Sequence, residues 1–102
     1  MKKYGLHGHL IATKGTGDQL ANILLRASEL VSKAKGCHIY LISRDPNNPE
    51  AVWITEVWET KEDHGNSLKN MEVKALIGEA MSLIESVPSK GQELDVMGGW
   101  GV

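Results

Sequence analysis

Residues 51–59 of the chain, AVWITEVWE, contain the pattern that decides the fold. The stretch is rich in β-branched and aromatic residues, and alternate residues of a strand point to opposite faces of a sheet. Both faces are largely apolar, with Val52, Ile54, Glu56 and Trp58 on one and Trp53, Thr55 and Val57 on the other. We therefore expect a central strand that is covered on both sides. Glu56 is the exception, because a carboxylate on a covered face needs a hydrogen-bond partner or an opening.

Three more strands are predicted before and after this one. Apolar and β-branched residues favour strands at residues 4–13, 37–43 and 92–97. In the first of these, Leu6 and Gly8 share one face, and His7 and His9 share the other. Residues 44–50, RDPNNPE, form the turn of a hairpin that joins the second strand to the central strand.

Two helical regions separate the strands. Apolar residues recur at helical spacing over residues 18–35, and Gly36 is a natural stop. The second region begins at Thr60, which can cap a short first piece. The main helix is then expected over residues 68–87, ended by Pro88.

Length and composition limit what the protein can be. A chain of 102 residues fits a single domain over residues 1–102. The net charge of -2 gives no electrostatic case for binding nucleic acid. The single cysteine, Cys37, fits a reducing compartment and is expected to be a small buried residue rather than a nucleophile. Because there is no apolar run of 18 residues and no signal-peptide pattern, we expect a cytoplasmic protein with no membrane partner.

The predicted order of elements is β-α-β-β-α-β, which is the ferredoxin-like arrangement. In this α+β fold a four-stranded antiparallel sheet carries two helices on one face, so the other face is left bare. The candidates for that face are apolar, namely Trp53, Val57, Tyr40, Ile42 and Ile11. A bare apolar face marks an interface, so we expect a homodimer through the helix-free face of the sheet.

The end of the central strand and the residues after it resemble the antibiotic biosynthesis monooxygenase family. The resemblance rests on the β-α-β-β-α-β order, on Glu56-Val57-Trp58, and on Glu62-Asp63-His64 at the following helix start. It implies a dimeric α/β barrel, with a pocket in each subunit between the sheet and the helices. It also implies that Trp58, Leu6, Gly8 and Ile77 bind a small-molecule substrate.

The haem-degrading members of this family are a poorer match. They place an asparagine in strand one, where this chain has Gly8, and an axial histidine in the second helix, where it has Ile77. The equivalent of their pocket tryptophan is present as Trp58. Haem cleavage is therefore not expected.

Two residues are candidates for catalysis, and each has an alternative. Glu56 can orient a substrate or act as a base, or it can bond to helix backbone or to a histidine. His64 can accept a proton near neutral pH, or it can be a solvated residue at a helix start. The remaining histidines, His7, His9 and His38, are expected at an interface rather than around a metal, so no metal ligand is predicted.

The function expected from these residues is a cofactor-independent monooxygenase acting on a small aromatic or quinol-like metabolite. An electron-rich phenolate can pass an electron to oxygen directly, so the protein need only deprotonate, desolvate and orient it. Trp58 would orient the substrate, and His64 or Glu56 would accept its proton. The alternative is a module of the same fold that binds or isomerises a small metabolite without oxygen.

Overall fold

The computed structural model describes residues 2–85 and 91–102 of the chain. The strands are β1 (Lys3–Ile11), β2 (Cys37–Asp45), β3 (Asn48–Trp58) and β4 (Gln92–Val96). The helices are α1 (Gly17–Val31), α2 (Lys61–Ser67) and α3 (Met71–Met81). Among the described residues, no helix is long and apolar enough to span a membrane.

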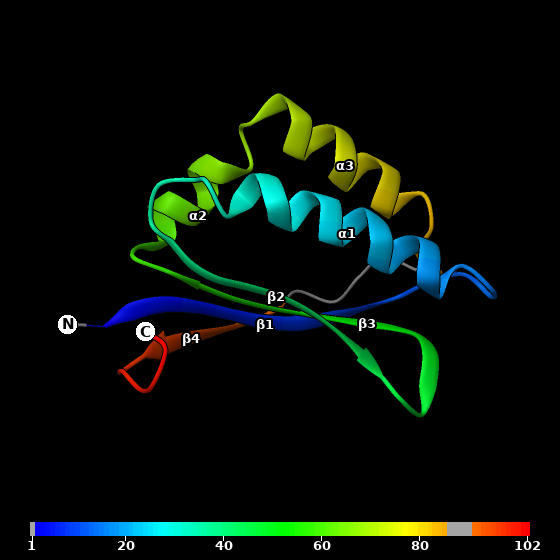
Figure 1. The fold of residues 1–102 in the computed structure, drawn as a ribbon, viewed down its shortest axis with the longest axis horizontal. Coiled ribbons are helices and arrows are strands. Elements are labelled where there is room, and N and C mark those ends of the chain that lie inside the picture. Colours follow the sequence, from blue (N-terminus) through cyan, green and yellow to red (C-terminus); the bar gives the residue numbers. More distant parts are fainter. Residues whose placement is uncertain (1, 86–90) are drawn as a thin grey trace.

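The four strands form one antiparallel sheet in the order β2-β3-β1-β4. The three helices of the described residues all lie on one side of this sheet (Figure 1). This is the ferredoxin-like α+β arrangement that the element order predicted. The central position of β3, between β2 and β1, agrees with its apolar faces.

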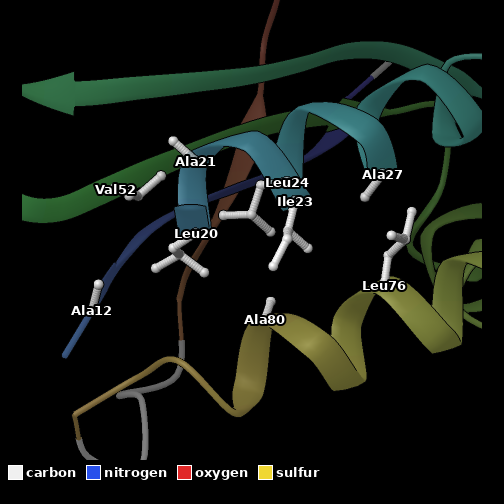
Figure 2. Packing of buried hydrophobic residues seen from close by; sticks show 9 residues of the cluster. All are labelled: Ala12, Leu20, Ala21, Ile23, Leu24, Ala27, Val52, Leu76 and Ala80. Carbon is white, nitrogen blue, oxygen red and sulfur yellow. The ribbon is translucent and has the colours of Figure 1, made fainter. Parts of the chain in front are cut away.

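The main core lies where α1 packs between the sheet and α3. Its buried members are aliphatic, and they are Ala12, Leu20, Ala21, Ile23, Leu24, Ala27, Val52, Leu76 and Ala80. Figure 2 shows Leu76 and Ala80 pointing from α3 toward α1. Alanines at Ala27 and Ala80 leave room for the two helices to approach closely, which suits a chain without phenylalanine.

The helices are shorter than their apolar stripes predicted. Helix α1 ends at Val31 rather than at residue 35, and a turn leads to Gly36, whose φ of 84° requires glycine. The second region is divided at residues 68–70, and Asn70 caps α3 by accepting hydrogen bonds from the backbone N–H of Glu72 and Val73.

The end of α3 also differs from the prediction. The helix stops at Met81, and Ile84 then forms an isolated bridge with Ala12. The stop expected at Pro88 lies outside the described residues.

The hairpin between β2 and β3 is tighter than the predicted turn over residues 44–50. Only Pro46 and Asn47 lie outside the two strands, and the Asp45 carboxylate accepts a hydrogen bond from the backbone N–H of Asn47. Both strands therefore extend into the segment that its Pro, Asn and Asp residues predicted to be a turn.

The prediction that Tyr40 and Ile42 face away from the helices is wrong. The pairing of β2 with β3 shifts by one residue between Cys37 and Ile39, and this irregularity reverses the faces of the residues that follow. Tyr40 and Ile42 pair with Glu56 and Ile54 and pack against the cores on the helix side. The helix-free face of β2 carries Ile39 and Leu41 instead.

Candidate functional site

Alternation along β3 brings Glu56 and Trp58 to the helix side of the sheet. Trp58 is completely buried and packs with Val31 and Val73. Glu56 is 8% exposed, although it carries a carboxylate. Its strand neighbours on this face are Leu6 of β1 and Tyr40 of β2.

The Glu56 carboxylate is held by two side chains at the same oxygen. The indole N–H of Trp58 donates a hydrogen bond to Oε1 over 3.0 Å. Nε2 of His64 lies 3.6 Å from Oε1, within ion-pair range but beyond hydrogen-bond distance. Within residues 2–85 and 91–102, no hydrogen bond to the second oxygen, Oε2, is found.

His64 reaches this position from α2, whose first turn starts next to the end of β3. The Thr60 hydroxyl caps the helix by accepting a hydrogen bond from the backbone N–H of Asp63 over 3.0 Å. The His64 side chain is 17% exposed, and its ring centroid lies 5.6 Å from that of Tyr4 and 5.7 Å from that of Trp58. His64 thus faces Glu56 rather than solvent.

Burial is the main cause of the pKa shifts of the titratable side chains around Glu56. Burial raises the pKa of Glu56 above its ordinary value, while the Trp58 hydrogen bond and the charge of His64 act in the opposite direction. Burial and the hydrogen bond to Glu93 raise the pKa of Tyr4 to about 12. Burial and then Glu56 also raise the pKa of Tyr40 and of the Cys37 thiol, which disfavours a thiolate at Cys37.

A cavity of about 120 Å³, here called the Glu56 cavity, opens beside this carboxylate. Its lining is mostly aliphatic and consists of Leu6, Gly8, His9, Leu10, Ile54, Glu56 and Gly91. Leu6 and Gly8, two of the predicted substrate contacts, therefore lie at the cavity, and substrate binding by them stays a prediction. Trp58, His64 and Ile77 are not in this lining. Ile77 is partly buried and packs against the cluster that contains Trp58.

A second depression of about 570 Å³, here called the outer cleft, lies at the β1–β4 edge of the sheet. Its lining is rich in charge and consists of Lys2, Lys3, Tyr4, Glu59, Thr60, Lys61, Glu93, Leu94 and Asp95. The charges are largely paired: Glu93 accepts from the Tyr4 hydroxyl over 2.8 Å and lies 2.9 Å from Nζ of Lys61. Leu6 links the two depressions, because it pairs with Glu93 on one side and Glu56 on the other.

Four residues of the site were not identified from the sequence. Tyr4 lies against His64, Tyr40 lies beside Glu56, and Ile54 and Gly91 line the cavity. The alternation of β1 and β3 contained the information for Tyr4 and Ile54, because each shares a face with a predicted site residue. Tyr40 was not recognised because the irregularity in β2 changes the face on which it lies. Gly91 was not recognised because it is far from the other site residues in the sequence.

The imidazole rings of the other histidines lie away from Glu56, although His9 itself borders the cavity. On the helix-free face, the rings of His7 and His9 lie 5.2 Å and 4.5 Å from the ring of Trp53, and the His7 imidazole shares a hydrogen bond with Thr55. His38 pairs with Glu59 at the surface. In the described part of the chain, no group of three or more His, Cys, Asp or Glu side chains is placed to hold a metal.

Comparisons with known proteins agree on one family. The sequence profile described as "Antibiotic biosynthesis monooxygenase" matches residues 4–79. A solved structure from Chloroflexus aurantiacus J-10-fl, classed as an antibiotic biosynthesis monooxygenase, is 37% identical, with a TM-score of 0.86 and 95% of each chain covered.

More distant structures share the fold. One of the same class from Nitrosomonas europaea is 12% identical, with a TM-score of 0.86 over 93% of this chain and 90% of that chain. One from Caulobacter crescentus CB15 is 14% identical, with a TM-score of 0.85 over 95% of this chain and 92% of that chain. No curated protein matches.

Proposed function

Because the chain belongs to the antibiotic biosynthesis monooxygenase family, we propose that it oxidises a small aromatic or quinol-like metabolite with molecular oxygen and without a cofactor. The observation that carries the proposal is the buried carboxylate of Glu56 at an apolar cavity. Burial raises the pKa of Glu56, which brings it closer to that of a phenol and makes it a stronger base than an exposed carboxylate.

The first step is proton removal from the substrate. A phenolic hydroxyl in the Glu56 cavity donates its proton to Oε2, which gives a phenolate and a neutral Glu56. Trp58 and His64 hold Oε1, so the carboxylate is already oriented before the substrate arrives.

The second step is oxidation of the phenolate by oxygen. The phenolate transfers one electron to O₂, and the resulting phenoxyl radical and superoxide combine at a ring carbon that carries hydrogen. The peroxide takes up the proton held by Glu56, which returns Glu56 to its charged form. The hydroperoxide then loses water, formed from its terminal OH and the hydrogen of the same ring carbon, and this leaves a quinone. The sum is one phenol and one O₂ converted into one quinone and one water.

The remaining predicted site residues have supporting roles in this proposal. Leu6 and Gly8 contact the substrate ring at the cavity wall. Trp58 positions Glu56 through its indole N–H, and Ile77 supports Trp58 from the core. His64 stabilises the charged form of Glu56, because its own charge lowers the pKa of that carboxyl.

We further propose that the protein is a cytoplasmic homodimer that pairs through the helix-free face of the sheet. The support is apolar surface on that face, where Leu41 is 56% exposed and Leu94 is 46% exposed. The free cysteine, Cys37, fits a reducing compartment.

Oxygen consumption tests the proposed reaction. Purified protein is incubated with a panel of phenols and quinols in an oxygen electrode, and the products are identified by mass spectrometry. We expect uptake with at least one substrate, lowered by roughly a hundred- to ten-thousand-fold in Glu56→Gln, because the amide cannot accept the proton. Glu62→Gln is the matched control, since Glu62 is an exposed residue of α2.

The alternative function keeps the same proton transfer and omits oxygen. A carboxylate that removes and returns a proton is sufficient for isomerisation of a small metabolite. The oxygenase proposal is rejected if compounds of the panel are bound or isomerised without oxygen uptake. The alternative function is then supported if Glu56→Gln abolishes this binding or isomerisation.

A further inference from the structure

We infer that the Glu56 cavity accepts a single-ring phenol and excludes phenols with a second fused ring. The inference rests on the proposed function, since it names the size of the molecule whose proton Glu56 removes. It is carried by the volume of the cavity, by its aliphatic lining, and by a close glycine contact at its wall.

The volume admits one six-membered ring. The Glu56 cavity measures about 120 Å³. An aliphatic cavity of about 150 Å³ in another protein holds one benzene molecule. A second fused ring needs most of that volume again, so a two-ring phenol would extend beyond the cavity as it stands.

The lining matches the two ends of a phenol. Leu6, Leu10 and Ile54 present aliphatic carbon to the ring. His9 contributes backbone, because its imidazole lies against Trp53 on the opposite face of the sheet. Glu56 is then the one charged side chain of the described lining, and its Oε2 accepts the hydroxyl proton in the proposed reaction.

The wall at Gly8 is backbone and cannot yield by rotating a side chain. A Cβ on Gly8 would lie 3.0 Å from Cα of Gly91, and a Cβ on Gly91 would lie 3.2 Å from Cδ1 of Leu6. The two glycines are therefore in direct contact, with Leu6 packed on the second. A larger ligand on this side would have to separate Gly8 from Gly91.

The outer cleft offers no place for a second ring either. Beyond Leu6 the same face carries the Tyr4–Glu93 hydrogen bond and the Lys61–Glu93 ion pair. A fused apolar ring there would take these groups out of water without replacing their hydrogen bonds. Small polar substituents on a single ring could extend into this cleft.

Binding without oxygen separates size selection from catalysis. We would titrate the protein anaerobically with phenol, 2-naphthol and anisole by calorimetry. Phenol should bind at least about 10-fold more tightly than 2-naphthol, a ratio typical of steric exclusion from an apolar pocket. Anisole, which has the same ring but no hydroxyl proton, should bind more weakly than phenol.

A larger cavity should weaken the preference for phenol over 2-naphthol. Leu6→Ala removes side-chain carbon from the wall, and Leu6 is outside both buried clusters, so the variant is expected to fold. Its affinity for 2-naphthol should rise by at least about 10-fold relative to the unmodified protein. Leu25→Ala on α1 is the control, because Leu25 is 48% exposed and lines neither the cavity nor the outer cleft. It should leave both affinities unchanged.

The outcomes distinguish the inference from the proposed function. Equal binding of phenol and 2-naphthol by the unmodified protein, or no binding of phenol, overturns the inference whatever the variants do. Size-selective binding without any oxygen uptake would reject the monooxygenase proposal and leave the inference standing. Oxygen uptake with one-ring and two-ring phenols alike would overturn the inference alone.

Discussion

The carboxylate of Glu56 is surrounded by apolar side chains, and this burial raises its pKa by more than Trp58 and His64 lower it. A carboxyl group whose pKa is higher in the folded than in the unfolded protein stabilises the fold fully below the unfolded pKa. That contribution is lost as pH rises from the ordinary value of 4.5 through the folded value. The charged form of Glu56 is thus tolerated at a cost in stability.

Replacing Glu56 with glutamine removes this pH dependence. The free energy of unfolding of Glu56→Gln should rise relative to that of the unmodified protein as pH increases above about 4.5, because only the unmodified protein must bury a charge. Urea unfolding of both proteins between about pH 4 and pH 8 measures the difference. Glu62→Gln, at an exposed position, should show no such trend. A difference that falls with pH would mean that the buried charge is net stabilising.

His64 acts on the same carboxyl group from α2. Removing its charge in His64→Ala should raise the pKa of Glu56, because His64 is one of the two groups that lower it. In the proposed reaction turnover depends on the charged form of Glu56, so the acid limb of the pH–rate profile should move to higher pH. His38→Ala is the control, since His38 pairs with Glu59 at the surface. An unchanged profile would separate His64 from the reaction.

At the scale of elements, Gly36 fixes how the turn after α1 meets α2. Its φ is 84°, and a Cβ there would overlap the carboxylate of Asp63. Gly15 has nearly the same φ, 82°, but a Cβ there would meet nothing within 4 Å. Substitutions at these two glycines therefore distinguish the cost of backbone strain, present at both, from the cost of steric overlap, present only at Gly36.

Alanine at these two positions should have unequal effects. Gly15→Ala should destabilise the protein by about 1 kcal/mol through backbone strain alone, and Gly36→Ala should cost about 1–3 kcal/mol more because Asp63 must move. Thermal or urea unfolding of the two variants provides the comparison. Equal losses of stability would show that α2 shifts freely, and with it His64.

At the scale of the whole molecule, the proposed dimer can be tested on the exposed part of the helix-free face. Leu41→Asp should give a monomer, because the interface would bury an unpaired charge, whereas the unmodified protein should scatter light as a dimer. Leu25→Asp on α1 is the control. Val57 is unsuitable for this test, since it is only 7% exposed within one chain and an aspartate there would disturb the fold itself. A monomeric unmodified protein at micromolar concentration would reject the dimer.

The requirement for metal can be tested on the purified protein. Proton transfer by Glu56 and direct reaction of a phenolate with oxygen need no metal, so dialysis against a chelator should leave turnover unchanged. Loss of activity that added iron or copper restores would contradict this prediction, and so would a purified protein with the absorption band of haem.

Much of the fold could be predicted because its determinants are local. The two-residue period of β1 and β3 assigned Leu6, Gly8, Glu56 and Trp58 to one face, and the structure confirms that face. Helix ends were less predictable. Apolar periodicity continues past Val31 and Met81, where capping and contact with the sheet end the helices.

The site itself depended on tertiary structure. Alternation fixed the face of Glu56 from the sequence alone, because a strand's geometry repeats every two residues. Only the folded chain decided that His64 turns toward Glu56, that Trp58 is buried, and that Tyr40 joins them across a strand irregularity. Gly8 and Gly91, which are far apart in the sequence, come into contact and form part of the cavity wall. Such contacts depend on how whole helices and strands pack together, and the local pattern of residues does not reveal this packing.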